Sequence, residues 1–203
     1  EGGADICFAT NYLGHFLLSH LLLDTIAASA PSRIVNLASV MHWAGTAAFE
    51  PLLSGPCATG YSESKLAMVM HANELCVRVR QMYPDRDVRV FSVDPGFTAS
   101  DIWRNFNRGP WALIDVAKTL VMLSPAQGCR TTVEAATRAD LQTGAHLVPM
   151  RFPIYPQTYG RWLYLAQTAI ARCAFGCRQE LSSPVSRDPA QQNRLWDVSV
   201  AFL

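Results

Sequence analysis

The sequence predicts an α/β fold, namely the carboxyl-terminal part of a doubly wound parallel sheet flanked by helices. Helical patterns alternate along the chain with three short apolar runs, at 33–39, 87–96 and 144–149. This alternation is typical of a parallel sheet with helical crossovers. The runs are nearly continuous in apolar residues, as expected for strands that are buried on both faces. Three strands are too few for a complete doubly wound domain, so we expect the fold to be incomplete at its amino terminus.

The first half of the chain predicts two helices and two strands. Residues 5–28 have helical periodicity, and their polar side chains make the segment a poor transmembrane span. The strand at 33–39 is followed by a loop over 40–60, and a second helix is expected at 61–82. The strand at 87–96 ends in Pro-Gly, where pairing must stop.

The second half continues the same order of elements. Helices are predicted at 115–123 and after Pro125, and a third strand at 144–149, parallel to the other two. The segment 150–186 is irregular. A last helix is expected over 188–202, because Asp188 is a suitable cap and Pro189 suits a first turn.

Composition limits the classes of function. The 203 residues are 50% hydrophobic and 16% charged with a net charge of +1, which suits a globular domain. The arginines are scattered, so no nucleic-acid partner is expected. Six cysteines show no framework spacing, which favours free thiols in a reducing compartment. The five histidines form no HExxH motif, so we assign no metal.

The stretch YSESK (61–65) places a tyrosine and a lysine four residues apart at the start of a predicted helix. Side chains at this spacing lie on one face of a helix. A neighbouring ammonium favours the phenolate and is expected to lower the pKa of Tyr61 from about 10. The pair is therefore a candidate proton-transfer device. The alternative is a loop tyrosine beside a solvated lysine.

Short polar groups follow the predicted strands at the carboxyl edge, where open α/β sheets bind ligands. Ser39 ends the strand 33–39, and its hydroxyl could donate to a substrate carbonyl. Gly96 allows close approach of a flat ligand, and Thr98 and Ser100 follow it. Asn11 lies within an apolar helix, where a buried amide needs partners.

Four stretches together resemble the short-chain dehydrogenase/reductase family, and most of all its retinol dehydrogenase and WW domain-containing oxidoreductase branch. They are NYLGHF (11–16), RIVNLAS (33–39), YSESK (61–65) and DPGFTAS (94–100), and the terminal RLWDVS (194–199) is similar to the last helix of that branch. The resemblance covers residues 1–149 and 187–200. It implies a Rossmann-like fold.

The resemblance also implies roles for individual residues. Asn11 matches the asparagine that holds a water of the proton relay, and Ser39 matches the serine that polarises the carbonyl. Tyr61 matches the catalytic acid–base. Lys65 matches the lysine that binds the nicotinamide ribose and lowers the tyrosine pKa. The stretch from Pro95 to Ser100, including Gly96 and Thr98, matches the loop that contacts the nicotinamide; Ser100 stands where the family more often has threonine.

One departure from the family is large. No G-x-G-x-x-G turn occurs in the sequence, so the segment that would hold the pyrophosphate is not found, and we expect the natural protein to be longer. The choice between NADP and NAD is left open for the same reason. The expected organisation is a catalytic part at 1–149, an insertion or lid at 150–186 and a final helix at 187–203. Within the insertion, 162–177 is either a lid or membrane-surface helix, or an amphipathic surface helix.

The function expected is hydride transfer between a nicotinamide and an alcohol or carbonyl group. Apolar residues in the loop at 97–113 suggest a lipophilic substrate; they are Phe97, Ile102, Trp103, Phe106 and Trp111. The alternative is a non-catalytic protein that uses its first two helices as an interaction module, or a piece of a longer enzyme. A homodimer and contact with a membrane surface remain open, and the expected location is the cytoplasm. A serine hydrolase is not expected, because GxSxG is absent.

Overall fold

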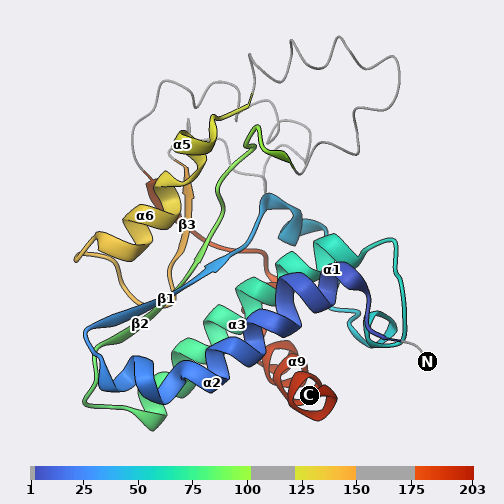
Figure 1. The fold of residues 1–203 in the computed structure, drawn as a ribbon, viewed down its shortest axis with the longest axis horizontal. Coiled ribbons are helices and arrows are strands. Elements are labelled where there is room, and N and C mark those ends of the chain that lie inside the picture. The colour runs from blue at the N-terminus through green and yellow to red at the C-terminus, as the bar shows by residue number, and fades with distance from the viewer. Residues whose placement is uncertain (1–2, 102–121, 150–176) are drawn as a thin grey trace.

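The structure of the protein is a computed structural model, which describes residues 3–101, 122–149 and 177–203 (Figure 1). Helices and strands alternate along the first part of the chain, as the sequence predicts. In chain order these elements are α1 Ile6–Phe8, the π-helical η1 Ala9–Leu13, α2 Gly14–Ala28, β1 Ser32–Leu37, the 3₁₀ turns η2 Val40–Ala44 and η3 Glu50–Leu53, α3 Gly60–Met82 and β2 Val88–Val93. They are followed by α5 Pro125–Gly128, α6 Arg130–Thr137, β3 His146–Pro149, β4 Cys177–Glu180, η6 Val185–Arg187 and α9 Pro189–Phe202.

The described strands form one sheet in the order β1-β2-β3-β4. Strands β1, β2 and β3 are parallel neighbours, so the prediction of three adjacent parallel strands is confirmed. Strand β4 pairs antiparallel with β3 and lies inside the stretch 150–186, for which the sequence predicts no strand. Its sequence, CRQE, is short and polar, and a strand of this kind is held by its pairing partner rather than by apolar periodicity.

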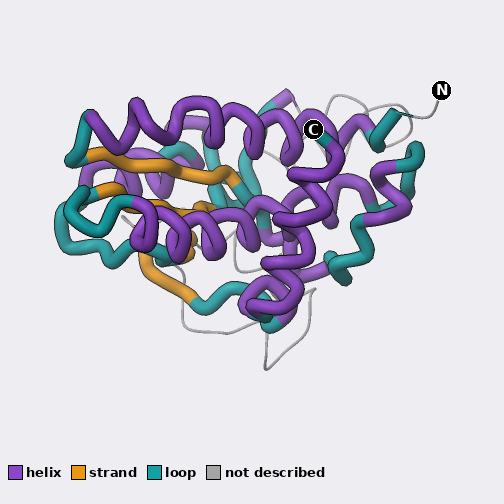
Figure 2. Tube along the Cα trace, turned by 90° about the horizontal axis from the view of Figure 1, so that it is seen from below, coloured by secondary structure: helices purple, strands orange, loops and turns teal. Residues whose placement is uncertain are grey.

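Two layers of helices cover the two faces of the sheet, and Figure 2 shows the strands lying between helices. On one face, Ile34 and Val90 belong to the larger core cluster, which is shared with α3. On the other face, Phe91 and Val93 pack with Ala135 of α6. Side chains of a strand alternate between its faces, so an apolar run such as VRVFSV can supply both cores at once.

A π-helical segment interrupts the predicted helix at 5–28. The backbone is α-helical at Ile6–Phe8, π-helical at Ala9–Leu13 and α-helical again from Gly14. Single π turns inside α-helices occur frequently at functional sites. This one contains Asn11, so the local widening of the helix coincides with a residue that the sequence marks as a site candidate.

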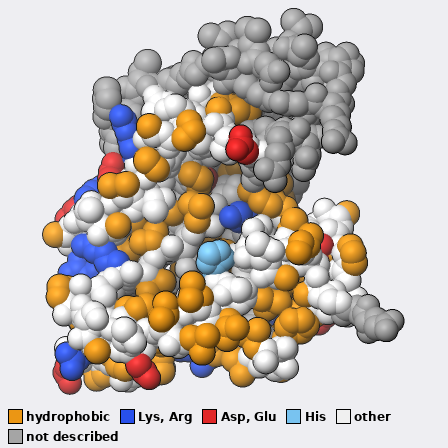
Figure 3. All heavy atoms as spheres, in the orientation of Figure 1, with side chains coloured by type: hydrophobic (Ala, Val, Ile, Leu, Met, Phe, Trp, Pro, Cys, Tyr) orange, Lys and Arg blue, Asp and Glu red, His pale blue; other side chains and the backbone are white. Residues whose placement is uncertain are grey.

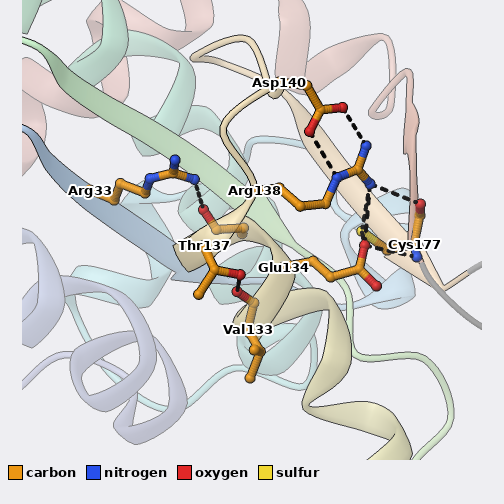
Figure 4. A network of polar contacts seen from close by, with 8 residues as sticks. Arg33, Val133, Glu134, Thr137, Arg138, Asp140 and Cys177 are labelled. Atoms are coloured by element: carbon orange, nitrogen blue, oxygen red, sulfur yellow. Dashed lines mark hydrogen bonds and ion pairs between the residues drawn. The ribbon is translucent and has the colours of Figure 1, made fainter.

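A network of polar contacts ties β4 to α6 (Figure 4). The Glu134 carboxylate accepts hydrogen bonds from the Cys177 thiol at 2.9 Å and from the Cys177 backbone N–H at 3.2 Å. Arg138 binds the same carboxylate at 3.2 Å and Asp140 at 2.6 Å. Burial raises the pKa of the Cys177 thiol to about 12, so the thiol keeps its proton and stays a donor. These contacts anchor strand β4, which lies in the predicted insertion 150–186, to helix α6.

The final helix is confirmed at Pro189–Phe202. The Asp188 side chain caps it by accepting from the Ala190 N–H at 2.9 Å. The helix packs along α3, where the Arg78 guanidinium lies 4.0 Å from the centre of the Trp196 ring. It also reaches the first helix, because the Tyr12 and Ser199 hydroxyls are 2.8 Å apart. Residues at the two ends of the chain thus share one core.

Several predictions fall outside the described residues. These are most of the helix at 115–123, the loop residues Ile102, Trp103, Phe106 and Trp111, and the part of the insertion at 150–176. The last residue of the predicted helix, Leu123, is described and is not helical. It forms an isolated parallel bridge with Thr98, so the helix prediction is wrong at this end. Among the described helices, the continuous stretch Ile6–Ala28 is long and apolar enough to cross a membrane by length and composition alone.

Candidate active site

Ser39 and Tyr61 meet at the carboxyl edge of the sheet. Ser39 lies two residues beyond the end of β1, in extended backbone, and it begins the turn η2. Tyr61 is the second residue of α3. The Ser39 hydroxyl is near enough to the Tyr61 phenol to lower its pKa. A substrate oxygen placed between these hydroxyls would contact both, which is the geometry that proton transfer to a carbonyl requires.

Lys65 lies one helical turn after Tyr61 on the same face of α3. Its Nζ is 5.7 Å from the centre of the Tyr61 ring and donates to the Leu37 carbonyl oxygen at 3.0 Å. Burial lowers the pKa of Lys65, and the negative charge of Asp94 opposes that shift. An ammonium has three N–H donors. With one directed to Leu37, two remain for other acceptors at this edge.

The prediction that Lys65 lowers the pKa of Tyr61 is wrong for this structure. Burial raises the pKa of Tyr61, and the Ser39 hydroxyl only partly offsets this effect. The negative charge of Asp94 raises it further. The physical reason is that the phenol is taken out of water while the ammonium of Lys65 is directed to a backbone oxygen. The phenol is therefore protonated at neutral pH.

Asn11 reaches this site from the π-helical turn. Its Nδ2 donates to the Ser64 hydroxyl at 3.1 Å, and that hydroxyl donates to the Tyr61 carbonyl at 2.7 Å. The side chain of Asn11 is thus bound to the first turn of α3, directly behind Tyr61. The expected need of this amide for a partner is met by Ser64, which the sequence analysis did not single out.

The turn after β2 lies at the same edge. Gly96 has φ 74°, a conformation that favours glycine, and its N–H donates to the Asp94 carboxylate at 2.8 Å. The Thr98 hydroxyl bonds the Pro95 carbonyl at 3.3 Å, which closes the turn. Ser100 is exposed and lies beyond this closed turn. The structure therefore brings Pro95, Gly96 and Thr98 into one compact loop and leaves Ser100 at its margin.

Two buried polar residues near the site were not assigned by the sequence analysis. Asp94 is 1% exposed, and its charge acts on Tyr61 and Lys65. Its place directly before Pro95-Gly96, at the end of a strand, is a signal that could have identified it. His42 is also 1% exposed and contacts the backbone of Ser39. No pattern in the sequence marks it.

A cavity of about 720 Å³ lies apart from these residues, between α3, the sheet edge and the segment before α9. Its lining includes Trp43, His146, Arg178, Glu180 and Arg187, but not Ser39, Tyr61 or Lys65. The candidate site is therefore located by convergent polar groups at the sheet edge and not by the volume of a pocket.

The residues at this edge fit the nicotinamide end of a dinucleotide. Lys65 offers ammonium donors toward ribose hydroxyls, and the Gly96 turn presents backbone without a side chain at its tightest point. The chemistry that would hold a pyrophosphate differs: it requires a glycine-rich turn before a helix. The sequence has no such turn.

Comparison with known proteins gives a consistent picture. A family model described as short chain dehydrogenase matches residues 3–111. Human retinol dehydrogenase 11 is 34% identical over 208 residues, which cover 99% of this chain and 54% of that protein. Mouse retinol dehydrogenase 13 is 41% identical over 109 residues, covering 52% of this chain and 31% of that protein. The chain spans about half the length of the relatives that it matches over nearly all its residues.

Two solved structures share the fold. An uncharacterized protein from Mycobacterium paratuberculosis superposes with a TM-score of 0.60 at 24% identity, covering 96% of this chain and 57% of that one. An NADPH-bound short chain oxidoreductase from Pseudomonas aeruginosa PAO1, described as containing an atypical catalytic center, superposes with a TM-score of 0.51 at 15% identity. That match covers 73% of this chain and 60% of the other.

Proposed function

Because this chain belongs to the short chain dehydrogenase family, on its retinol dehydrogenase branch, we propose that it carries the proton-transfer half of a nicotinamide-dependent oxidoreductase. The substrate would be an alcohol or its carbonyl counterpart. The observation that carries the proposal is the convergence of Ser39, Tyr61 and Lys65 at the carboxyl edge of the sheet, where the Ser39 hydroxyl lowers the pKa of Tyr61 and the Lys65 Nζ lies 5.7 Å from the centre of the Tyr61 ring.

Each residue of the site has a separate task in this reaction. Ser39 donates a hydrogen bond to the substrate oxygen and orients it toward the phenol. Tyr61 delivers its proton to that oxygen in reduction, or removes it in oxidation. A bound nicotinamide supplies or accepts the hydride at the neighbouring carbon. General acid catalysis of this kind is typically worth about 10²–10⁴ in rate.

Lys65, Pro95, Gly96, Thr98 and Ser100 form the proposed cofactor contacts. Lys65 would bind the ribose, while the loop 95–100 would face the nicotinamide ring. Asn11 and Ser64 hold the first turn of α3 from behind, through the 2.7 Å hydrogen bond to the Tyr61 carbonyl. These contacts would not select between NAD and NADP, because the two cofactors differ only at the adenosine end.

A lipophilic substrate of the retinoid type is the class we propose. Two similar proteins are named retinol dehydrogenases, and an apolar residue, Phe97, lies within the loop 95–100 that would face the nicotinamide. The test is consumption of reduced cofactor, at millimolar concentration, by the 203-residue chain with retinal, a long-chain aldehyde and a short aldehyde. Faster turnover of the two long substrates supports the proposal. Turnover that Tyr61→Phe leaves unchanged contradicts the proton-transfer role, and equal rates for all three aldehydes contradict the lipophilic class.

One observation favours a second candidate, a binding role without catalysis. Leucines on a single face of α2 are 38–71% exposed, and Figure 3 shows apolar side chains gathered over this part of the molecule. They are Leu17, Leu18, Leu21 and Leu22. A helix of a second copy could cover this face. Light scattering would detect a dimer that Leu18→Glu dissolves, and a concentration-independent monomer contradicts this role.

A further inference from the structure

The His42 side chain connects the backbone of Ser39 to the carboxyl-terminal part of the chain. Its Nδ1 lies 2.6 Å from the Ser39 carbonyl oxygen. Its Nε2 lies 3.3 Å from the backbone nitrogen of Ser183. The imidazole is 1% exposed, so both contacts are made away from water. The ring thus joins the turn after β1 to Ser183, which lies 141 residues further along the chain.

These two contacts define the protonation state of the ring. A carbonyl oxygen only accepts hydrogen bonds, so Nδ1 must carry a proton. A backbone N–H only donates, so Nε2 must be unprotonated. His42 is therefore the neutral Nδ1–H tautomer. Burial lowers its pKa, which keeps the ring neutral even though Asp94 and the Ser39 carbonyl favour the charged form.

The segment that His42 grips is itself well anchored. The Ser183 carbonyl accepts from the Ser186 hydroxyl at 2.7 Å, and the Ser186 carbonyl accepts from Gln192 of α9 at 2.7 Å and from Asn73 of α3 at 3.0 Å. Because α9 and α3 belong to the core, Ser183 is a firm point of attachment. The ring connects this anchored segment to the turn η2, which Ser39 caps.

We propose that His42 is a positioning residue, which holds Ser39 at the place where its hydroxyl meets the Tyr61 phenol. The inference rests on the proposed function, because Ser39 and Tyr61 are assigned there as the groups that receive the substrate oxygen. Ser39 lies two residues beyond the end of β1; the N–H of the preceding residue, Ala38, still donates to the Val93 carbonyl oxygen at 2.7 Å, and Ser39 itself caps the turn that follows. A small displacement of such a group can cost about 10²-fold in rate.

Two conservative variants separate the two contacts of the ring. An asparagine amide reaches about as far as ring Nδ1, so His42→Asn retains a donor to the Ser39 carbonyl and loses the contact with Ser183. A glutamine amide reaches about as far as ring Nε2, so His42→Gln retains an acceptor for the Ser183 N–H and loses the side-chain donor to Ser39, whose carbonyl keeps only the backbone N–H of residue 42 at 3.0 Å. The ring volume is lost in both, so a merely structural role predicts equal effects.

Two readouts need no turnover. The Tyr61 Cζ chemical shift of labelled protein reports the surroundings of the phenol, and with them the approach of the Ser39 hydroxyl, and amide hydrogen exchange reports the Ser183 N–H. We expect His42→Gln to move the Tyr61 shift and leave Ser183 protected. We expect His42→Asn to leave the Tyr61 shift in place and expose Ser183 to exchange. In turnover, His42→Gln should fall about tenfold to a hundredfold, and His42→Asn should retain most of the activity.

The outcomes distinguish the two hypotheses. Equal changes of the Tyr61 shift in both variants, or none in either, overturn the positioning role. The crossed pattern without any turnover of wild type supports the positioning role and contradicts the proposed function. If neither variant folds, nitrogen NMR of the wild-type protein tests the proposal, because it identifies the tautomer of His42. A ring protonated at Nε2, or one that titrates near its usual pKa of about 6.5, overturns the inference.

Discussion

The Lys65 ammonium lies 3.0 Å from the Leu37 carbonyl oxygen, at the point where β1 ends. This contact places a cation of the first turns of α3 beside the strand that leads to Ser39. Replacing the side chain should therefore affect two properties at once, the binding of a nicotinamide cofactor and the arrangement at the strand end.

Lys65→Ala should lower both turnover and cofactor affinity, and Lys65→Arg should recover only part of either. A planar guanidinium is larger than an ammonium and cannot place a compact charge at the same point. Titration calorimetry and steady-state rates are the measurements. Arg80→Ala is a matched control, because it removes an exposed cation from the same helix. Full activity of Lys65→Arg would show that any positive charge suffices there.

Tyr61→Phe should reduce turnover by about 10²–10⁴ while cofactor affinity stays close to wild type. The substitution removes the phenol's proton and little else, so its effect falls on the transition state. Tyr83→Phe removes the same hydroxyl from the far end of α3 and should leave turnover unchanged. A small effect of Tyr61→Phe at every pH tested would assign YSESK to cofactor binding alone.

The 203-residue chain should bind reduced nicotinamide mononucleotide and NADPH with affinities within a few-fold of each other. The residues that fit a cofactor face only its nicotinamide end, and the sequence has no glycine-rich turn for a pyrophosphate. Calorimetric titration of both ligands is the test. Micromolar binding of NADPH together with very weak binding of the mononucleotide would reveal a phosphate site elsewhere in the chain.

His71 should make the free energy of unfolding depend on pH. Burial and the neighbouring His20 and His15 lower its pKa to about 3, while an unfolded histidine titrates at about 6.5. The unfolded chain therefore binds the extra proton between these values. Stability is fully present above pH about 6.5 and falls by up to about 1.4 kcal/mol per pH unit as the pH drops toward 3.

Urea unfolding between pH 5 and 6.5 tests this prediction, because carboxylates contribute least to the slope in that range. His71→Leu should reduce the slope of the free energy of unfolding against pH by close to one proton. It should also lower the stability by an amount that does not depend on pH, because the hydrogen bond with Asn36 is lost. His15→Leu changes an exposed histidine and should leave the slope nearly intact. An unchanged slope in His71→Leu would mean that another group causes the pH dependence.

The sequence by itself determined the main elements of the fold. Strands β1 and β2 are short apolar runs that pack on both faces, and such runs have few alternatives to a covered parallel sheet. The last helix carries its own start signal at Asp188. The spacing of Tyr61 and Lys65 on one helix face also follows from the chain alone, because it depends only on helical geometry.

The tertiary structure alone decided the features that depend on distant partners. Strand β4 is polar and exists through its pairing with β3 and its contacts with Glu134. The pKa of Tyr61 rises instead of falling, because burial by other segments of the chain is the largest effect on it. The His42 ring accepts a hydrogen bond from the Ser183 N–H, which lies 141 residues further along the chain. Local patterns record which faces are apolar, whereas desolvation and hydrogen bonding between remote segments exist only once the chain has folded.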